Sequence, residues 1–170
     1  MKRLMIILAS ILFLTGCGST PADHTAAVRG ALMADCAFTA DFTYETLQGS
    51  AEVEKKGDTF SVKMLLPEAL AGLSFCFEAE SLTITCDDMA MTLPRGSIPQ
   101  EALISVLRRV TGGEDALVIE ETNGLITATA DQVFFHYIAE LDAETLTPQR
   151  ITVPELSIEI TLRDYTLTKE

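Results

Sequence analysis

The chain has 170 residues, with 12 Lys and Arg against 25 Asp and Glu, and its formal net charge is −13. So acidic a chain without a basic stripe argues against a nucleic-acid phosphate backbone or anionic lipid headgroups as partners. Hydrophobic residues make up 48% of the chain while tryptophan is absent, which fits a globular core and weakens a sugar-stacking role.

The N-terminal residues are typical of a bacterial export signal. Lys2 and Arg3 precede an almost wholly apolar run over residues 4–14, which is shorter than the ~20 residues that span a bilayer. The exit at residues 14–17 reads Leu-Thr-Gly-Cys and resembles the lipobox cut by lipoprotein signal peptidase. That resemblance implies cleavage just before Cys17 and acylation of its sulfur, and two or more acyl chains hold a protein stably on a membrane. The alternative is an ordinary secretory signal that meets a cysteine by chance.

Three segments follow from this signal. Residues 1–16 are removed, residues 17–24 tether the protein to the outer leaflet of the cell membrane, and residues 25–170 form a single domain. Loss of the two cations at positions 2 and 3 leaves 10 basic residues against 25 acidic ones. The roughly 150 residues that remain are a common size for one domain. We therefore expect an extracytoplasmic protein that lipid, rather than charge, holds at the membrane.

The cysteines give a hint about the cell. Lipidation uses Cys17, which leaves Cys36, Cys76 and Cys86, so at least one thiol stays unpaired. Free thiols are unusual in exported proteins where disulfides form efficiently. We therefore expect a single-membrane or anaerobic bacterium that does not depend on oxidative folding.

The domain begins with a helix and continues in strands. Residues 22–34 are rich in alanine, and Asp23 can cap them, so they predict a helix. From Cys36 onward apolar and polar residues alternate, which predicts a meander of antiparallel strands. These strands are 36–44, 47–54 and 60–64, with residues 55–58 as a turn between the last two.

An apolar segment over residues 65–73 interrupts the strands. Pro67 and Gly72 break regular structure, yet the segment carries four leucines. Connections are normally polar, so two interpretations stay open. The leucines either cover one end of the core from a folded turn, or form an exposed lid or contact patch.

A hairpin follows this segment. Residues 73–79 and 82–86 predict two strands around a turn at 80–81, in a register that pairs Phe77 with Ile84. The same register places Cys76 and Cys86 on opposite faces of the sheet, where they cannot form a disulfide.

The best-specified helix is expected over about residues 98–111. Ser97 and Gln100 form a capping box with Pro99 in the first turn. Apolar residues follow at helical spacing, and two glycines end the pattern at 112–113. The apolar face of this helix needs a sheet to lie on.

Strands resume to the end of the chain. Asn123-Gly124 is a tight-turn signal, and residues 133–141 are apolar on both faces, which predicts a central strand or one covered on both sides. Residues 142–148 turn the chain, and Pro154 marks a bend or an edge. The strands predicted here are 116–121, 125–130, 133–141, 150–153 and 156–165.

This order of elements resembles the LolA/LolB-type lipoprotein-binding fold. The likeness is carried by the strand 38–44 directly after a helix, the exit at 64–68 into 70–73, and the turn at 141–148. That turn is similar to the aspartate–threonine–proline turn common in the superfamily. The resemblance implies an α+β fold, mainly β, whose curved antiparallel sheet forms a half-barrel. An N-terminal helix and the helix at about 98–111 then cover its concave face.

The resemblance also implies an apolar cavity that binds an acyl chain or a lipoprotein. The residues expected at this cavity or its loop are Leu65, Leu66, Leu70, Leu73, Leu103 and Leu107. A cell with one membrane has no outer membrane to deliver lipoproteins to, however, and a related lipoprotein of spore-forming bacteria acts by binding a cell-wall enzyme. An envelope protein–protein module without a lipid ligand is therefore the alternative.

No catalytic or metal-binding set stands out in the sequence. His24 lies near the tether and His136 in a strand, and this scarcity of histidine argues against Ser-His-Asp catalysis and against a metal site. Paired acids at 87–88, 114–115 and 120–121 leave an envelope hydrolase as a third hypothesis. We expect a non-catalytic binding protein without cofactor or metal.

Overall fold

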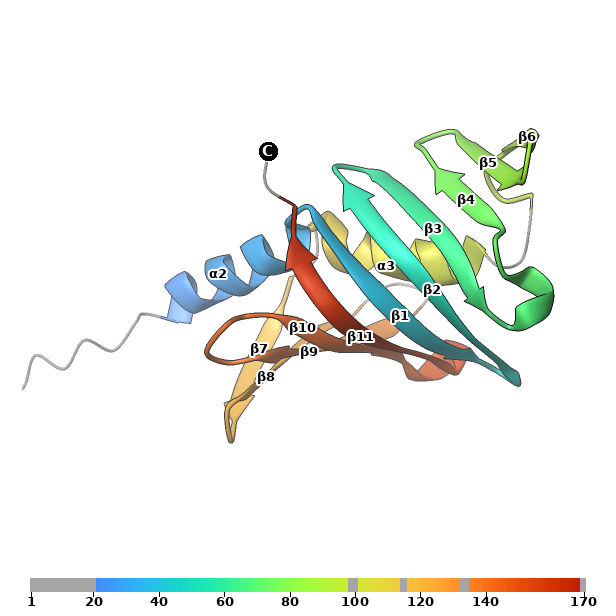
Figure 1. Ribbon diagram of the computed structural model, residues 1–170. Coiled ribbons are helices and arrows are strands. Elements are labelled where there is room, and N and C mark those ends of the chain that lie inside the picture. Colours follow the sequence, from blue (N-terminus) through green and yellow to red (C-terminus); the bar gives the residue numbers. More distant parts are fainter. Residues whose placement is uncertain (1–20, 98–100, 114–115, 132–134, 169–170) are drawn as a thin grey trace, which may run out of the picture.

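The computed structural model describes residues 21–97, 101–113, 116–131 and 135–168. Within these residues one antiparallel sheet of eleven strands is accompanied by two α-helices (Figure 1). The strands lie in the order β6-β5-β4-β3-β2-β1-β11-β10-β9-β8-β7. The first strand, β1, therefore pairs with the last, β11, in the middle of the sheet. The expected α+β class, a curved antiparallel sheet with two helices, is confirmed.

The bounds of the predicted helices and strands agree with the observed ones to within a few residues, whereas β6 and the two 3-10 helices were not predicted. The helices are α2 (Pro21–Met33) and α3 (Glu101–Gly112), and two short 3-10 helices are η1 (Glu68–Leu70) and η2 (Pro154–Leu156). The strands are β1 (Cys36–Tyr44), β2 (Leu47–Lys56), β3 (Thr59–Leu66), β4 (Ser74–Phe77), β5 (Ser81–Cys86), β6 (Met89–Pro94), β7 (Val118–Thr122), β8 (Leu125–Asp131), β9 (His136–Asp142), β10 (Pro148–Val153) and β11 (Ile158–Leu167).

The core lies between the concave face of the sheet and α3, which runs along that face (Figure 1). Alternate residues of each strand point inward, so the sheet presents a continuous apolar surface to the helix. Burying one large aliphatic side chain stabilises a fold by about 1.5–3 kcal/mol. On α3 the buried residues are Ile104, Val106, Leu107 and Val110.

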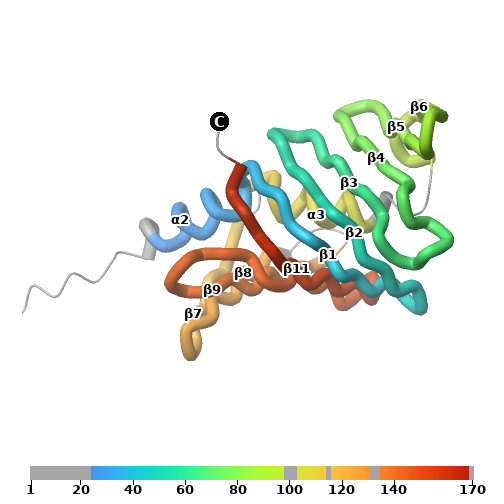
Figure 2. The backbone as a smooth tube through the Cα atoms, viewed as in Figure 1, coloured from blue at the N-terminus to red at the C-terminus, as the bar shows by residue number. Residues whose placement is uncertain are grey.

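Helix α2 lies at one end of the molecule, as the tube in Figure 2 shows, and the connection between β3 and β4 lies at the other. The buried residues of α2 are Val28 and Leu32. The guanidinium of Arg29 donates a hydrogen bond to the carbonyl oxygen of Gly113, just past the end of α3. The two helices are therefore joined at the N-terminal end of the domain.

Tight turns join neighbouring strands where the sequence predicts them. Asn123 and Gly124 both have positive φ, 54° and 79°, which is the geometry of a type I′ hairpin turn between β7 and β8. At the turn after β9, Asp142 accepts hydrogen bonds from the backbone N–H groups of Glu144 and Thr145. These bonds lower the pKa of the Asp142 carboxyl, with the one from Thr145 contributing most. The Asp-Thr-Pro turn of the sequence is thus a closed, self-bonded loop.

The predicted register of the β4–β5 hairpin is wrong by two residues. Phe77 pairs with Leu82 rather than with Ile84, because the N–H of Glu78 donates to the carbonyl of Ser81 at 3.0 Å and closes the turn earlier. A shift of two leaves the faces unchanged. Cys76 and Cys86 still point to opposite faces and are free, as predicted.

The strand predicted over residues 133–141 is a central one, as the first of its two alternatives expects: β9 lies inside the sheet between β8 and β10, and only one of its faces is fully buried. One further expectation needs correction. Lys55 belongs to β2 and is buried rather than part of a turn, because the turn begins at Gly57. The predicted start of the helix at residues 98–100, the acids at 114–115 and residues 133–134 lie outside the described residues.

Candidate functional site

The candidate site is an apolar cavity of about 150 Å³ between the sheet and α3. Strands β1 to β4 form its floor, Leu103, Ile104 and Leu107 of α3 form its roof, and Pro67 and Leu70 close one end. The remaining lining residues share an inward, apolar side chain: Ala40, Phe42, Leu47, Ala51, Val53, Val62, Met64, Phe75, Phe77 and Ile160.

The hollow exists because two small residues face each other in the floor. Ala40 of β1 and Ala51 of β2 are direct cross-strand partners, and both are buried. Opposite residues in antiparallel strands have Cβ atoms only about 5 Å apart, so two methyl groups leave space beneath α3 that larger side chains would fill. Phe42 lies at one side of this space, opposite Gly49.

The size of the cavity limits what fits. An apolar cavity of about 150 Å³ holds a molecule such as benzene, whereas sites for drug-sized ligands span about 300–1,000 Å³. The space under α3 therefore takes the end of an alkyl chain or one bulky apolar side chain. It does not take a whole acyl chain without movement of its roof.

The structure brings three of the six predicted site leucines together. Leu70, Leu103 and Leu107 line the cavity, while Leu73 packs on the core elsewhere. Leu66 is 56% exposed and does not line the cavity.

Leu65, at the end of β3, is half-buried and is likewise not part of the cavity wall. The segment from Leu65 to Leu73 is a folded turn tied back to β3. The N–H of Met64 donates to the carbonyl of Leu73 at 2.9 Å, and the N–H of Gly72 donates to the carbonyl of Met64 at 3.1 Å. Its leucines at 70 and 73 cover one end of the core, as the first interpretation predicts, and Leu66 alone of the four is largely exposed.

A larger hollow of about 490 Å³ lies on the outer face of the same strands. Small and polar side chains such as Thr39, Ser61 and Ser74 line it, together with the ion pair between Lys63 and Glu52 at 3.6 Å. It is open to solvent, and its lining mixes these polar groups with apolar residues such as Phe38 and Phe75. The smaller cavity under α3 is the better ligand site because it is less open to solvent and its lining is almost entirely apolar.

Among the described residues, the structure gives no support to catalysis by histidine or by the paired acids. The ring Nδ1 of His136 pairs with the Glu155 carboxylate, a local partner of the kind expected for a strand histidine. Asp87 and Asp88 form an exposed turn, and Glu120 and Glu121 lie exposed on β7. Within the described ranges, no three His, Cys, Asp or Glu side chains converge on a metal-sized site.

Cys17 and the residues around it lie outside the described part of the chain, so lipidation stays a prediction. His24 lies in α2, where its Nε2 is buried without a hydrogen-bond partner among the described residues. None of the described helices is both long and apolar enough to traverse a bilayer.

Comparison with known proteins gives a likeness of fold. No protein-family model and no curated protein match the sequence. An uncharacterised conserved protein of Thermus thermophilus superposes with a TM-score of 0.54 at 10% identity, over 89% of this chain and 90% of that chain. A LolA superfamily protein of Nitrosomonas europaea gives a TM-score of 0.47 at 9% identity, over 90% and 96% of the two chains.

A third solved structure is a complex of the CwlD amidase from Clostridioides difficile with the GerS lipoprotein, at 12% identity and a TM-score of 0.41 over 92% and 98% of the two chains. At 10% identity the match to the Thermus thermophilus protein shows the fold alone. The half-barrel expected from the sequence is present in the curved sheet and the helix along its concave face.

Proposed function

We propose that this protein is a lipid-anchored, extracytoplasmic and non-catalytic binding module whose cavity under α3 takes the end of an alkyl chain. The observation that carries the proposal is the partly enclosed apolar space above the Ala40–Ala51 pair, walled by aromatic and aliphatic side chains. An apolar group gains about 25 cal/mol for each Å² of its surface that is removed from water.

The rest of a long chain has a route out of this cavity. Pro67 and Leu70 lie at its end, and the exposed Leu66 directly precedes them in the chain. An acyl group with its methyl end under α3 therefore leaves past the β3–β4 connection. Only a modest displacement of that connection widens the opening, because η1 is short and has no buried residues of its own.

The proposed anchor precedes α2, which lies at the opposite end of the domain from this opening. Cys17 is only a few residues before the start of α2 at Pro21, and Figure 1 shows α2 and the β3–β4 connection at opposite ends of the molecule. A short tether of this kind spans at most about 3.5 Å per residue. The opening then faces away from the membrane that holds the protein, toward ligands presented from outside.

The test uses the full chain in cells that produce it. A fatty acid with a photoreactive diazirine near its methyl end is fed to the cells, irradiated, and the labelled internal peptides are mapped by mass spectrometry. We expect label on α3 and on β1–β2. Ala51→Leu fills the cavity and abolishes this label, while Ala37→Leu adds the same bulk on the outer face of β1 and retains it. Equal labelling of the Ala51→Leu variant contradicts the proposal.

The anchor is tested separately. Labelled palmitate becomes covalently attached to the N-terminal peptide of the natural chain, and Cys17→Ser removes that label. Retention of the label in Cys17→Ser contradicts lipidation but leaves the cavity proposal standing, because the two labels lie on different peptides.

The small size of the cavity favours one alternative, a half-barrel that acts through its surface on an envelope protein and binds no lipid. Crosslinking on intact membranes followed by capture of the full chain then returns one dominant envelope protein. In that case the Ala51→Leu variant captures the same partner as the natural chain, whereas a ligand-dependent role predicts that it does not.

A further inference from the structure

Three sulfur-containing residues share one face of the hairpin formed by β5 and β6. Cys86 ends β5, Met89 begins β6, and the two residues are direct cross-strand partners. Met91 lies two residues further along β6 and therefore points to the same face as Met89. All three side chains line one open hollow of the surface, which Asp88 also borders.

The turn fixes the relative positions of these side chains. Only Asp87 and Asp88 separate the two strands, and Asp87 has a φ of 50°, as two-residue hairpin turns require. Directly opposed Cβ atoms lie about 5 Å apart and diagonal ones about 7–8 Å apart, so an ion between the three residues is within reach of all of them. Methionine has three rotatable bonds, which lets both thioethers turn toward the thiol.

The exposure of the two methionines is unusual for apolar residues. Met89 is 72% exposed and Met91 is 53% exposed, at the edge of the sheet and beyond the cover of α3 within the described residues. They contribute little to the core at these positions. Their side chains, by contrast, are accessible to an ion from solvent.

We propose that Cys86, Met89 and Met91 bind one soft monovalent cation, Cu(I) or its redox-inert analogue Ag(I). Thioether sulfurs are soft ligands that favour Cu(I), whereas Zn(II) is bound by thiolate, imidazole and carboxylate, and Mg(II) and Ca(II) prefer oxygen ligands. The two methionines therefore favour Cu(I) over Zn(II). On binding, the Cys86 thiol gives its proton to solvent and the resulting thiolate forms the bond to the metal, so affinity falls as pH falls. The carboxylates of Asp87 and Asp88 add a negative field that favours a cation.

Leucine variants separate this role from a simple apolar contact. Met89→Leu with Met91→Leu keeps the size and hydrophobicity of the surface but removes both thioethers. Cys86→Ser removes the thiol. Two controls carry the same changes elsewhere, Met33→Leu on α2 and Cys76→Ser on the other face of the adjoining strand β4.

The experiment titrates the full-length chain in detergent with silver nitrate, and in parallel with Cu(I) kept reduced against a chromophoric Cu(I) chelator. We expect one ion per chain and a shift of the ε-methyl NMR signals of Met89 and Met91 but not of Met33. The double leucine variant weakens binding at least about 10-fold, Cys86→Ser weakens it further, and both controls retain it.

Absence of tight binding overturns the proposal. So does binding that the double leucine variant leaves unchanged, or that Cys76→Ser removes as fully as Cys86→Ser, because a free thiol alone then explains the ion. The result does not depend on whether the cavity under α3 takes a ligand.

Discussion

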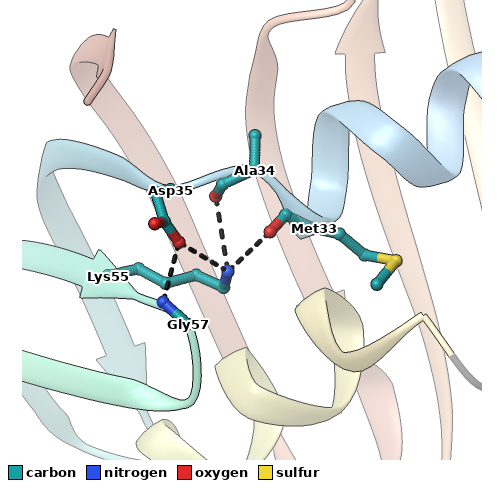
Figure 3. Close-up of polar contacts among 5 residues, drawn as sticks. All are labelled: Met33, Ala34, Asp35, Lys55 and Gly57. Carbon is teal, nitrogen blue, oxygen red and sulfur yellow. Dashed lines mark hydrogen bonds and ion pairs between the residues drawn. The ribbon is translucent and has the colours of Figure 1, made fainter. Parts of the chain in front are cut away.

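The ammonium nitrogen of Lys55 lies 2.6 Å from the carbonyl oxygen of Met33, the last residue of α2 (Figure 3). The same nitrogen lies 3.4 Å from the carbonyl oxygen of Ala34 and 3.7 Å from Oδ1 of Asp35. The last carbonyls of a helix have no partner within the helix, and a cation there also interacts favourably with the helix dipole. Lys55 therefore fastens the end of α2 to strand β2.

We predict that Lys55→Met destabilises the protein by about 2 kcal/mol, because methionine fills the same space but leaves part-buried carbonyl oxygens without their charged donor. Lys55 itself is only 4% exposed, so its ammonium group is held in place by these partners. Denaturant unfolding of the full chain measures the loss. The adjoining Lys56→Met variant is the control, since Lys56 is exposed and pairs with Glu54 at the surface. Equal midpoints for the two variants contradict this role of Lys55.

The sequence does not predict the role of Lys55. A Lys-Lys-Gly-Asp run has the composition of a solvated turn, and only the pairing of Cys36 with Lys55 places this lysine on the inward face of β2. The same is true of the cavity. Hydropathy alone identifies inward positions in single strands, but the Ala40–Ala51 pair that opens the space depends on the register between two strands.

Gly49 of β2 is a second position that depends on register. A Cβ atom at this residue lies 2.9 Å from the carbonyl oxygen of Leu66 and collides with the ring of Phe42, its cross-strand partner. We predict that Gly49→Ala destabilises the protein by about 1–3 kcal/mol, because β3 and the phenyl ring must shift to admit a methyl group. Phe42 lines the cavity, so labelling by the photoreactive fatty acid also falls.

Gly30→Ala supplies the control for that change. Gly30 lies in the interior of α2, and a Cβ atom there has no heavy atom within 4 Å. Alanine in the interior of a helix is more stable than glycine by roughly 0.5–1 kcal/mol, so this variant is expected to raise the midpoint of thermal unfolding. A Gly49→Ala protein as stable as the natural chain contradicts the close approach at that site.

Local patterns, by contrast, are sufficient for most of the architecture. Alternation with a period of two predicts the strands on both sides of α3, and Asn123-Gly124 predicts its turn, because each depends on neighbouring residues only. The β4–β5 hairpin shows the limit, since Ala79, Glu80 and Ser81 allow two turns of equal length. The hydrogen bond from Glu78 to Ser81 decides between them, and no local pattern reveals it.

The ion pair between Asp41 and Arg163 joins β1 to β11 and predicts a pH dependence. Arg163 binds both carboxylate oxygens, at 2.7 Å from Nη2 to Oδ1 and 2.6 Å from Nε to Oδ2. The hydrogen bond from Arg163 lowers the pKa of Asp41 below its ordinary value of 3.8, and one from Ser50 adds to the effect. A lowered pKa in the folded state stabilises the protein above the unfolded-state value, and this contribution is lost as pH falls through the folded-state value.

We therefore predict that the natural chain loses more free energy of unfolding than Asp41→Asn does when the pH falls from about 5 to about 2. Urea unfolding at a series of pH values gives this comparison. Arg163→Met is expected to flatten the profile to the same degree, and Asp41→Asn adds nothing in that background, since the two residues act as one pair. Parallel profiles for all four proteins refute the assignment.

Cys36 is predicted to be the least reactive of the three described thiols. It is 2% exposed at the start of β1, and burial raises its pKa, an effect that a hydrogen bond with Tyr165 partly offsets. Burial likewise raises the pKa of Tyr165, whose ring stacks on Phe38 at a centroid distance of 6.0 Å.

Because the thiolate is the form that is alkylated, iodoacetamide at pH 8 is expected to modify Cys76 and Cys86 in the folded protein and Cys36 only after denaturation. Peptide mass spectrometry after timed alkylation measures the three rates. Tyr165→Phe, which keeps the ring and removes the hydroxyl, leaves Cys36 protected if burial dominates; rapid alkylation of Cys36 in that variant shows instead that the hydroxyl holds the end of β11 over the thiol.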